Sequence, residues 1–142
     1  MVNQHQVRGF TLMEMLIVVS IIAILAMIAI PGYNYVITKS RRSDAKVALT
    51  KAATVLEQCY VLHNQYNYKD TSNVPCTPYS KTDAVVQSDD GYYKVVTTAL
   101  SATSYTLTAS PNDNSPQQSD NHCLNFKINS DGSKSATNDD CW

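Results

Sequence analysis

An apolar segment near the start of the chain constrains the fold more than any other feature. Residues 10–30 read FTLMEMLIVVSIIAILAMIAI, in which only Thr11, Glu14 and Ser20 are polar. As an α-helix these 21 residues would be about 31 Å long, close to the hydrocarbon thickness of a bilayer. We therefore expect this segment to lie in a membrane, at least transiently.

The rest of the chain is too poor in large apolar residues to bury such a helix. Residues 33–142 contain only 18 Leu, Ile, Val, Phe or Met, so their own core is thin and needs a further constraint. The formal net charge is −1, which excludes a protein that binds nucleic acid through a large positive charge.

Four cysteines supply a constraint of the required kind. An even number in a small domain indicates two disulfides formed in an oxidising compartment, here by Cys59, Cys76, Cys123 and Cys141. Three pairings are possible. We favour Cys59–Cys76 and Cys123–Cys141, because each closes a short loop and contributes about 3 kcal/mol in the chain-entropy model. The cysteines lack the close spacing of a zinc site, so we expect no metal.

Glu14 is the only charged residue between Arg8 and Lys39 and needs a physical explanation. Its carboxylate lies near one end of the apolar segment, from which it could reach the lipid headgroups. Alternatively, it neutralises a positive group. If the chain were cut after Gly9, Phe10 would carry a free α-amino group about one helical turn away. No small-residue cleavage site follows the apolar segment, which disfavours an ordinary signal peptide.

The order Gly9-Phe10-Thr11-Leu12-Met13-Glu14, followed by a long apolar run and Pro31-Gly32, closely resembles the N-terminus of type IV pilins. This resemblance implies that a prepilin peptidase removes residues 1–9 by cutting between Gly9 and Phe10, and then methylates the amino group of Phe10. It implies that Glu14 pairs with the Phe10 amine of an adjacent subunit during assembly.

The resemblance also divides the chain by role. Residues 10–32 would be the transmembrane and filament-core helix, and residues 33–142 the head with a C-terminal disulfide loop. The protein would cross the inner membrane once, with its head in the periplasm, before it enters an extracellular pilus. Its partners would be other pilins, both major and minor, the prepilin peptidase, the inner-membrane assembly platform and, before assembly, the membrane.

The remaining patterns predict an α+β head. We expect one helix over residues 10–60, bent or loosened at Pro31-Gly32, whose second half is amphipathic and packs on a sheet. The residues of its apolar face are Ala45, Ala48, Leu49, Ala52, Val55, Leu56, Cys59 and Leu62. Residues 63–91 read as a long connection. Strands are expected over 92–100, 104–110, around 124–128 and over 134–137, which gives a three- to four-stranded antiparallel sheet.

No motif in the chain indicates catalysis or a cofactor, and we expect neither. Lys39, Arg41 and Arg42 form a basic cluster that suits anionic lipid headgroups. The small head and the ending Asp140-Cys141-Trp142 most resemble a type IVa minor pilin that helps initiate assembly. Alternatives are a major pilin, a pseudopilin of a type II secretion system, and a membrane-anchored DNA-binding module of a competence pilus. Residues 63–142 hold five Lys and nine Asp, so we do not expect nucleic acid as a partner.

Overall fold

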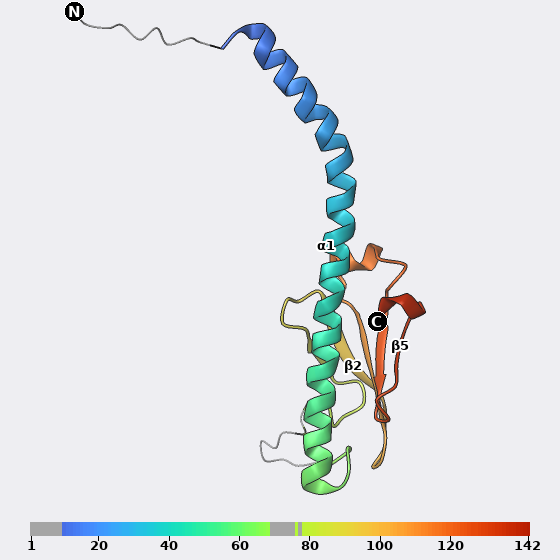
Figure 1. The fold of residues 1–142 in the computed structure, drawn as a ribbon. Helices are drawn as coiled ribbons and strands as arrows, with labels where there is room; N and C mark the ends of the chain where they lie inside the picture. Colours follow the sequence, from blue (N-terminus) through green and yellow to red (C-terminus); the bar gives the residue numbers. More distant parts are fainter. Residues whose placement is uncertain (1–9, 69–75, 77) are drawn as a thin grey trace, which may run out of the picture. The chain divides into compact units, whose positions relative to one another are not determined.

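The computed structural model describes residues 10–68, 76 and 78–142, apart from the side chain of Pro31. It contains one long helix, α1 (Leu12–His63), and five strands, together with two short 3-10 helices, η1 (Pro116–Ser119) and η2 (Asp139–Cys141). Figure 1 shows these elements in chain order. The chain divides into two units that meet between Ile37 and Thr38, so the apolar N-terminal unit and the head are described separately.

Helix α1 confirms the expected long helix and extends three residues further at its C-terminal end. The Thr11 hydroxyl accepts a hydrogen bond from the Glu14 N–H at 3.2 Å, which satisfies a free donor of the first turn. At the other end, Asn64 has φ of 55° and donates its N–H to the Tyr60 carbonyl at 2.7 Å. This left-handed residue ends the helix. The helix assignment is continuous through Pro31 and Gly32, where we had expected a bend or loosening.

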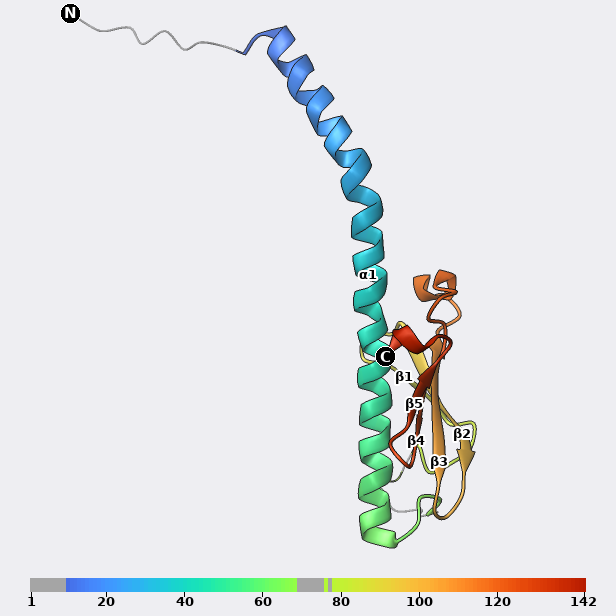
Figure 2. The ribbon, with the colours of Figure 1, turned by 45° about the vertical axis from the view of Figure 1, so that its right-hand side comes forward.

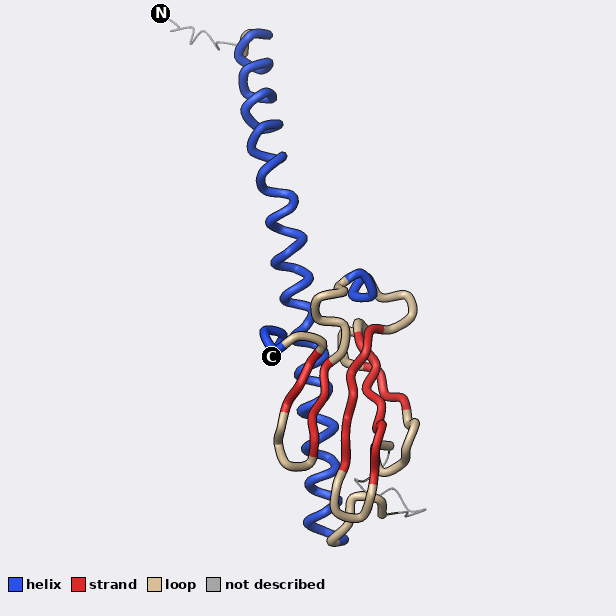
Figure 3. The backbone as a smooth tube through the Cα atoms, turned by 90° about the vertical axis from the view of Figure 1, so that its right-hand side faces the viewer, coloured by secondary structure: helices blue, strands red, loops and turns tan. Residues whose placement is uncertain are grey.

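The sheet is an antiparallel meander in which each strand pairs with the next along the chain. Figure 3 shows the strands beside one another over the second half of α1. Their bounds are β1 (Val85–Gln87), β2 (Tyr93–Leu100), β3 (Tyr105–Pro111), β4 (Phe126–Asn129) and β5 (Lys134–Ala136). The α+β expectation is confirmed, with one strand more than expected. The additional strand is β1, in which Val85 and Val86 pair with Val96 and Val95 of β2.

The core lies between one face of α1 and one face of the sheet (Figure 2). Ala45, Ala48 and Ala52 bring the helix backbone close to the strands, while Leu49 and Leu56 fill the space between them. The sheet contributes alternate residues, as the period of a strand requires. These residues are Tyr93, Val95 and Thr97 on β2, Tyr105, Leu107 and Ala109 on β3, and Phe126 and Ile128 on β4.

The predicted helix face is correct except near its end. Val55 is only partly buried against the core, and Leu62 is 62% exposed. With 3.6 residues per turn, Leu62 falls about a quarter of a turn away from the line of Ala45, Ala52 and Leu56 at the centre of the buried face, so its side chain lies outside the core.

We predict that Leu56→Ala lowers the free energy of unfolding by about 3 kcal/mol, because it removes a fully buried side chain and leaves a cavity. Urea unfolding of the full chain in detergent, followed by the fluorescence of Trp142, measures this. Leu62→Ala removes the same atoms from an exposed position of the same helix and should change the value by less than about 0.5 kcal/mol. Equal losses in the two variants would contradict this description of the core.

Candidate functional site

The N-terminal unit presents a continuous apolar surface. Its large apolar side chains between Phe10 and Ile30 are 44% to 84% exposed. The helix is long and apolar enough to cross a membrane. Such a surface is far larger than a soluble monomer exposes, so lipid or other chains must cover it. This is the segment that we expected to lie in a membrane.

The residues predicted for processing and assembly lie at the start of this unit. Phe10 is 79% exposed and lies two residues before the first residue of the helix, Leu12. Glu14 lies in the first turn of α1, where a negative charge interacts favourably with the helix dipole. Gly9, on the other side of the predicted cut, lies outside the described residues. The pairing of Glu14 with the Phe10 amine of a neighbouring subunit stays a prediction.

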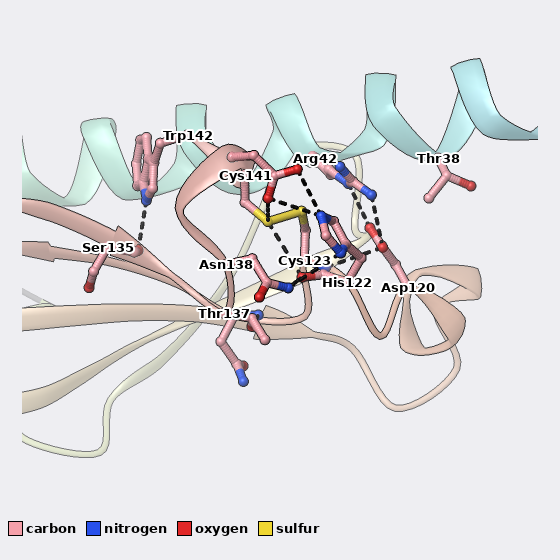
Figure 4. The surroundings of a disulfide bond; sticks show 12 residues. Thr38, Arg42, Asp120, His122, Cys123, Ser135, Thr137, Asn138, Cys141 and Trp142 are labelled. Atoms are coloured by element: carbon pink, nitrogen blue, oxygen red, sulfur yellow. Dashed lines mark hydrogen bonds and ion pairs between the residues drawn. A yellow bond between two sulfur atoms is a disulfide. The ribbon is translucent and has the colours of Figure 1, made fainter.

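The cysteines form the sequential pairs that we favoured. Cys59–Cys76 joins the last turns of α1 to the segment that follows it, with Cα atoms 5.0 Å apart. Cys123–Cys141 joins the segment before β4 to η2, with Cα atoms 5.6 Å apart, and so encloses the β4–β5 hairpin. Figure 4 shows this second disulfide beside α1. His122 lies within reach of both sulfurs, but these are bonded to each other and are not thiolate ligands for a metal.

A nearly buried ion pair ties the loop before this disulfide to α1. The Arg42 guanidinium donates to both carboxylate oxygens of Asp120, at 2.7 and 2.9 Å, and the side chains are only 11% and 4% exposed. Asp120 also accepts a hydrogen bond from the N–H of Cys123 at 3.3 Å. Next to this pair, the Gln117 amide donates to the Thr38 carbonyl at 3.2 Å. The start of the disulfide loop is therefore held to the first turns of α1 in the head.

Exposed polar groups close the other side of the disulfide loop. The His122 ring lies 2.8 and 2.9 Å from the two carboxylate oxygens of Asp140, and this contact lowers the pKa of the Asp140 carboxyl. The Asn138 amide donates to the His122 carbonyl at 2.6 Å. The loop is thus cross-linked by one covalent bond and by several hydrogen bonds around it (Figure 4).

A buried carboxylate, which the sequence analysis missed, organises the β1–β2 turn. Asp44 on α1 is 8% exposed and accepts hydrogen bonds from the Ser88 hydroxyl at 2.6 Å and the Tyr92 N–H at 3.2 Å. It also accepts a bond from the N–H of Asp90 at 3.3 Å. The carboxylate takes the place of backbone partners that this turn would otherwise lack.

Tyrosines cover the C-terminal end of α1. The hydroxyls of Tyr66 and Tyr105 donate to the Glu57 carboxylate at 3.0 to 3.1 Å. Burial, followed by the nearby Glu57 charge, raises the pKa of Tyr66 to about 12. Burial, followed by the Glu57 hydrogen bond, also raises the pKa of Tyr105. Both hydroxyls therefore stay protonated donors at neutral pH.

Two residues of the expected basic cluster, Arg41 and Arg42, interact with other side chains of the head. Arg42 is committed to Asp120, and the Arg41 guanidinium lies 4.9 Å from the centre of the Tyr92 ring. The interpretation of all three residues as a headgroup-binding set was therefore wrong for Arg42, whose side chain is nearly buried. In sequence, nothing distinguishes Arg42 from Arg41, because its partner Asp120 lies 78 residues away.

Comparisons with known protein families place this architecture. The model of a family described as "Type IV minor pilin ComP, DNA uptake sequence receptor" matches residues 31–127. A second model, described as "Prokaryotic N-terminal methylation motif", matches residues 4–30. Together the two matches cover both units of the chain.

Individual relatives match over part of the chain. The type IV major pilin protein PilA of Myxococcus xanthus is 42% identical over 60 residues, which is 42% of this chain and 27% of that protein. A fimbrial protein of Neisseria meningitidis is 27% identical over 95 residues, 67% of this chain and 56% of that protein. The matched segments thus span less than two thirds of these relatives.

A solved structure shares the fold. The crystal structure of the Neisseria meningitidis non-core minor pilin PilV has a TM-score of 0.50 and 21% sequence identity, and the alignment covers 71% of this chain and 87% of that one.

The Arg42–Asp120 ion pair gives a stability prediction with an internal control. Arg42→Ala leaves the nearly buried Asp120 carboxylate unpaired and should lower the free energy of unfolding by about 3 kcal/mol. Lys51→Ala removes an exposed ion pair between α1 and a loop, in which the side chains of Lys51 and Asp89 are 58% and 68% exposed. That change should lie within about 1 kcal/mol.

Urea unfolding of the full-length variants measures both values. A loss for Arg42→Ala no larger than that for Lys51→Ala would show that the Arg42–Asp120 pair does not hold the loop.

Proposed function

This chain belongs to the type IV pilins, within the family described as "Type IV minor pilin ComP, DNA uptake sequence receptor", and from that premise we propose that it is a minor structural subunit that helps initiate or prime assembly of a type IV pilus. The observation that carries the proposal is the long apolar helix surface within the segment that matches the methylation motif, on the helix that continues into a small cross-linked head. A subunit of a filament needs such a surface to pack against other subunits once it has left the membrane.

In this proposal, maturation prepares the N-terminus for assembly. The prepilin peptidase removes the leader, residues 1–9, by cutting between Gly9 and Phe10, and the new amino group of Phe10 is methylated. Residues 10–32 hold the subunit in the inner membrane, and the head, residues 33–142, lies in the periplasm. The match of residues 4–30 to the methylation motif supports this division.

During assembly the apolar helix moves from the bilayer into the core of the filament, and both surroundings are apolar. At the assembly platform, helix 10–32 leaves the bilayer and packs among the helices of other pilins. A free charge is costly in both surroundings, so pairing Glu14 with the Phe10 amine of the adjacent subunit favours one register of docking. The position of Glu14 in the first turn of α1 supports this role, since Phe10 lies one turn away.

Processing is the first test of the proposal. We predict that the full chain, expressed with a prepilin peptidase, yields a product that begins at Phe10 and is heavier than the unmodified fragment by about one methyl group. Intact mass and N-terminal sequencing measure this, and expression without the peptidase is the control. A product that keeps Met1 in the presence of the peptidase, or one cut after Ile30, would refute the pilin precursor.

The role of Glu14 gives a second prediction. Glu14→Gln removes the charge at nearly constant shape, so cleavage at Phe10 should continue while incorporation into filaments falls at least about tenfold, because the Phe10 ammonium loses its partner. Immunoblots of sheared filaments measure incorporation. Ser20→Ala is the matched control: it removes a polar group from the same apolar run, where the Ser20 hydroxyl donates to the Leu16 carbonyl of its own helix. If the Glu14→Gln variant enters filaments at the normal level, the proposed role of Glu14 in docking is refuted.

The description of the matching family favours a second candidate, a receptor for DNA on a competence pilus. The charge of the head argues against it as the main role, since residues 38–142 carry 10 Lys or Arg and 11 Asp or Glu. A duplex presents a dense line of negative charge, which such a surface does not complement broadly.

Fluorescence anisotropy with labelled duplex DNA separates the two candidates. If assembly is the main role, binding at physiological salt should be no tighter than the non-specific range, about 1 µM or weaker. Tighter binding that depends on the DNA sequence would make the receptor the leading function.

A further inference from the structure

An open groove of about 810 Å³ lies on the head along the outward side of α1. Its floor is the helix between Lys46 and Val55, and its two ends are aromatic, with Trp142 at one and Tyr79 at the other. Val47, in the middle of this floor, is 51% exposed. The groove therefore offers apolar contact area on a surface that the described residues of the head leave open.

Two lysines, Lys46 and Lys134, lie at one end of the groove. The Nζ atoms of Lys46 and Lys134 lie 5.8 and 5.0 Å from the centre of the Trp142 ring, which holds both amines at the same place. Trp142 is itself fixed, since its indole N–H donates to the Ser135 carbonyl at 2.7 Å. Among the described residues, neither Lys46 nor Lys134 forms an ion pair.

The surroundings of Lys46 are electropositive. Burial lowers the pKa of the Lys46 amine, and the charges of Arg42, Lys39 and Lys134 lower it further. An anion at this end would relieve that repulsion. The opposite end differs, because Lys51 there is paired with Asp89.

We propose that this groove binds a short peptide segment of a partner protein that carries apolar side chains and ends in one or two carboxylates. The carboxylates bind at Lys46 and Lys134, and the apolar side chains lie over Val47 toward Tyr79. The positive charge is confined to one end, which suits a short acidic segment, while a nucleic acid would need cations along its whole path. The inference is independent of whether the chain initiates pilus assembly.

The single tryptophan of the chain reports binding directly, since Trp142 lines the groove. The full chain in detergent is titrated with the amidated peptide Leu-Val-Leu-Asp-Glu while Trp142 fluorescence is followed. The same titration is made with Leu-Val-Leu-Asn-Gln, which lacks the charges, with Ser-Ser-Ser-Asp-Glu, which lacks the apolar side chains, and with a short oligothymidylate. Only the first peptide should give a saturable change.

Two double variants locate the site. Lys46→Gln with Lys134→Gln should raise the Kd for the first peptide about tenfold. Lys81→Gln with Lys127→Gln removes two exposed lysines elsewhere on the head and should leave the Kd unchanged. The proposal is overturned by three results: no saturable change up to about 1 mM peptide, equal affinity in both double variants, or binding of the oligothymidylate at these lysines in place of the peptide.

Discussion

The packing of one helix face on the sheet is the interaction on which the rest of this structure depends. Ala45, Ala48 and Ala52 let the helix backbone approach the strands, and Leu49 and Leu56 supply most of the volume that α1 buries there. Because α1 is continuous from Leu12, the same element that closes the head also carries an apolar surface that nothing in the described chain covers. The head buries its apolar helix face against its own sheet, whereas the apolar surface of the N-terminal unit must be covered by lipid or by other subunits.

Hydrogen bonds, an ion pair and a disulfide stabilise the head in addition to its thin apolar core. Asp44 organises the β1–β2 turn from one position on α1, and the Arg42–Asp120 pair holds the start of the C-terminal loop from a position half a turn away. The Cys123–Cys141 disulfide then fixes the end of that loop and keeps Trp142 near Phe126, with ring centres 5.9 Å apart. Each of these interactions starts or ends at a loop, where apolar packing is weakest.

The local patterns of the sequence predicted most of the fold. The strands expected over 92–100, 104–110, around 124–128 and over 134–137 correspond to β2, β3, β4 and β5, and most of the helical spacing from Ala45 to Cys59 lies on the buried face of α1. Strand β1 was missed because its three residues lie in a segment rich in turn-forming residues, and only pairing with β2 makes it a strand. Leu62 was placed in the core because an apolar residue at the edge of a helix face fits the helical spacing although its side chain is exposed.

Sequence reasoning was weakest for polar residues that act over long separations. Asp44 and Ser88 are 44 residues apart and Arg42 and Asp120 are 78 apart, so no local pattern pairs them. The N-terminal motif is local, because Gly9, Phe10 and Glu14 lie within six consecutive residues, and the roles predicted for them need no partner elsewhere in the chain.

Counting this subunit in purified filaments tests the central claim most directly. Quantitative mass spectrometry of sheared pili, with isotope-labelled peptides from the head as standards, gives its ratio to the most abundant subunit. We predict that the chain is present in the filaments, but at well under about a tenth of the most abundant subunit, because a complex that initiates assembly contains few copies of each subunit. Absence from filaments, or a place as their most abundant subunit, would contradict it.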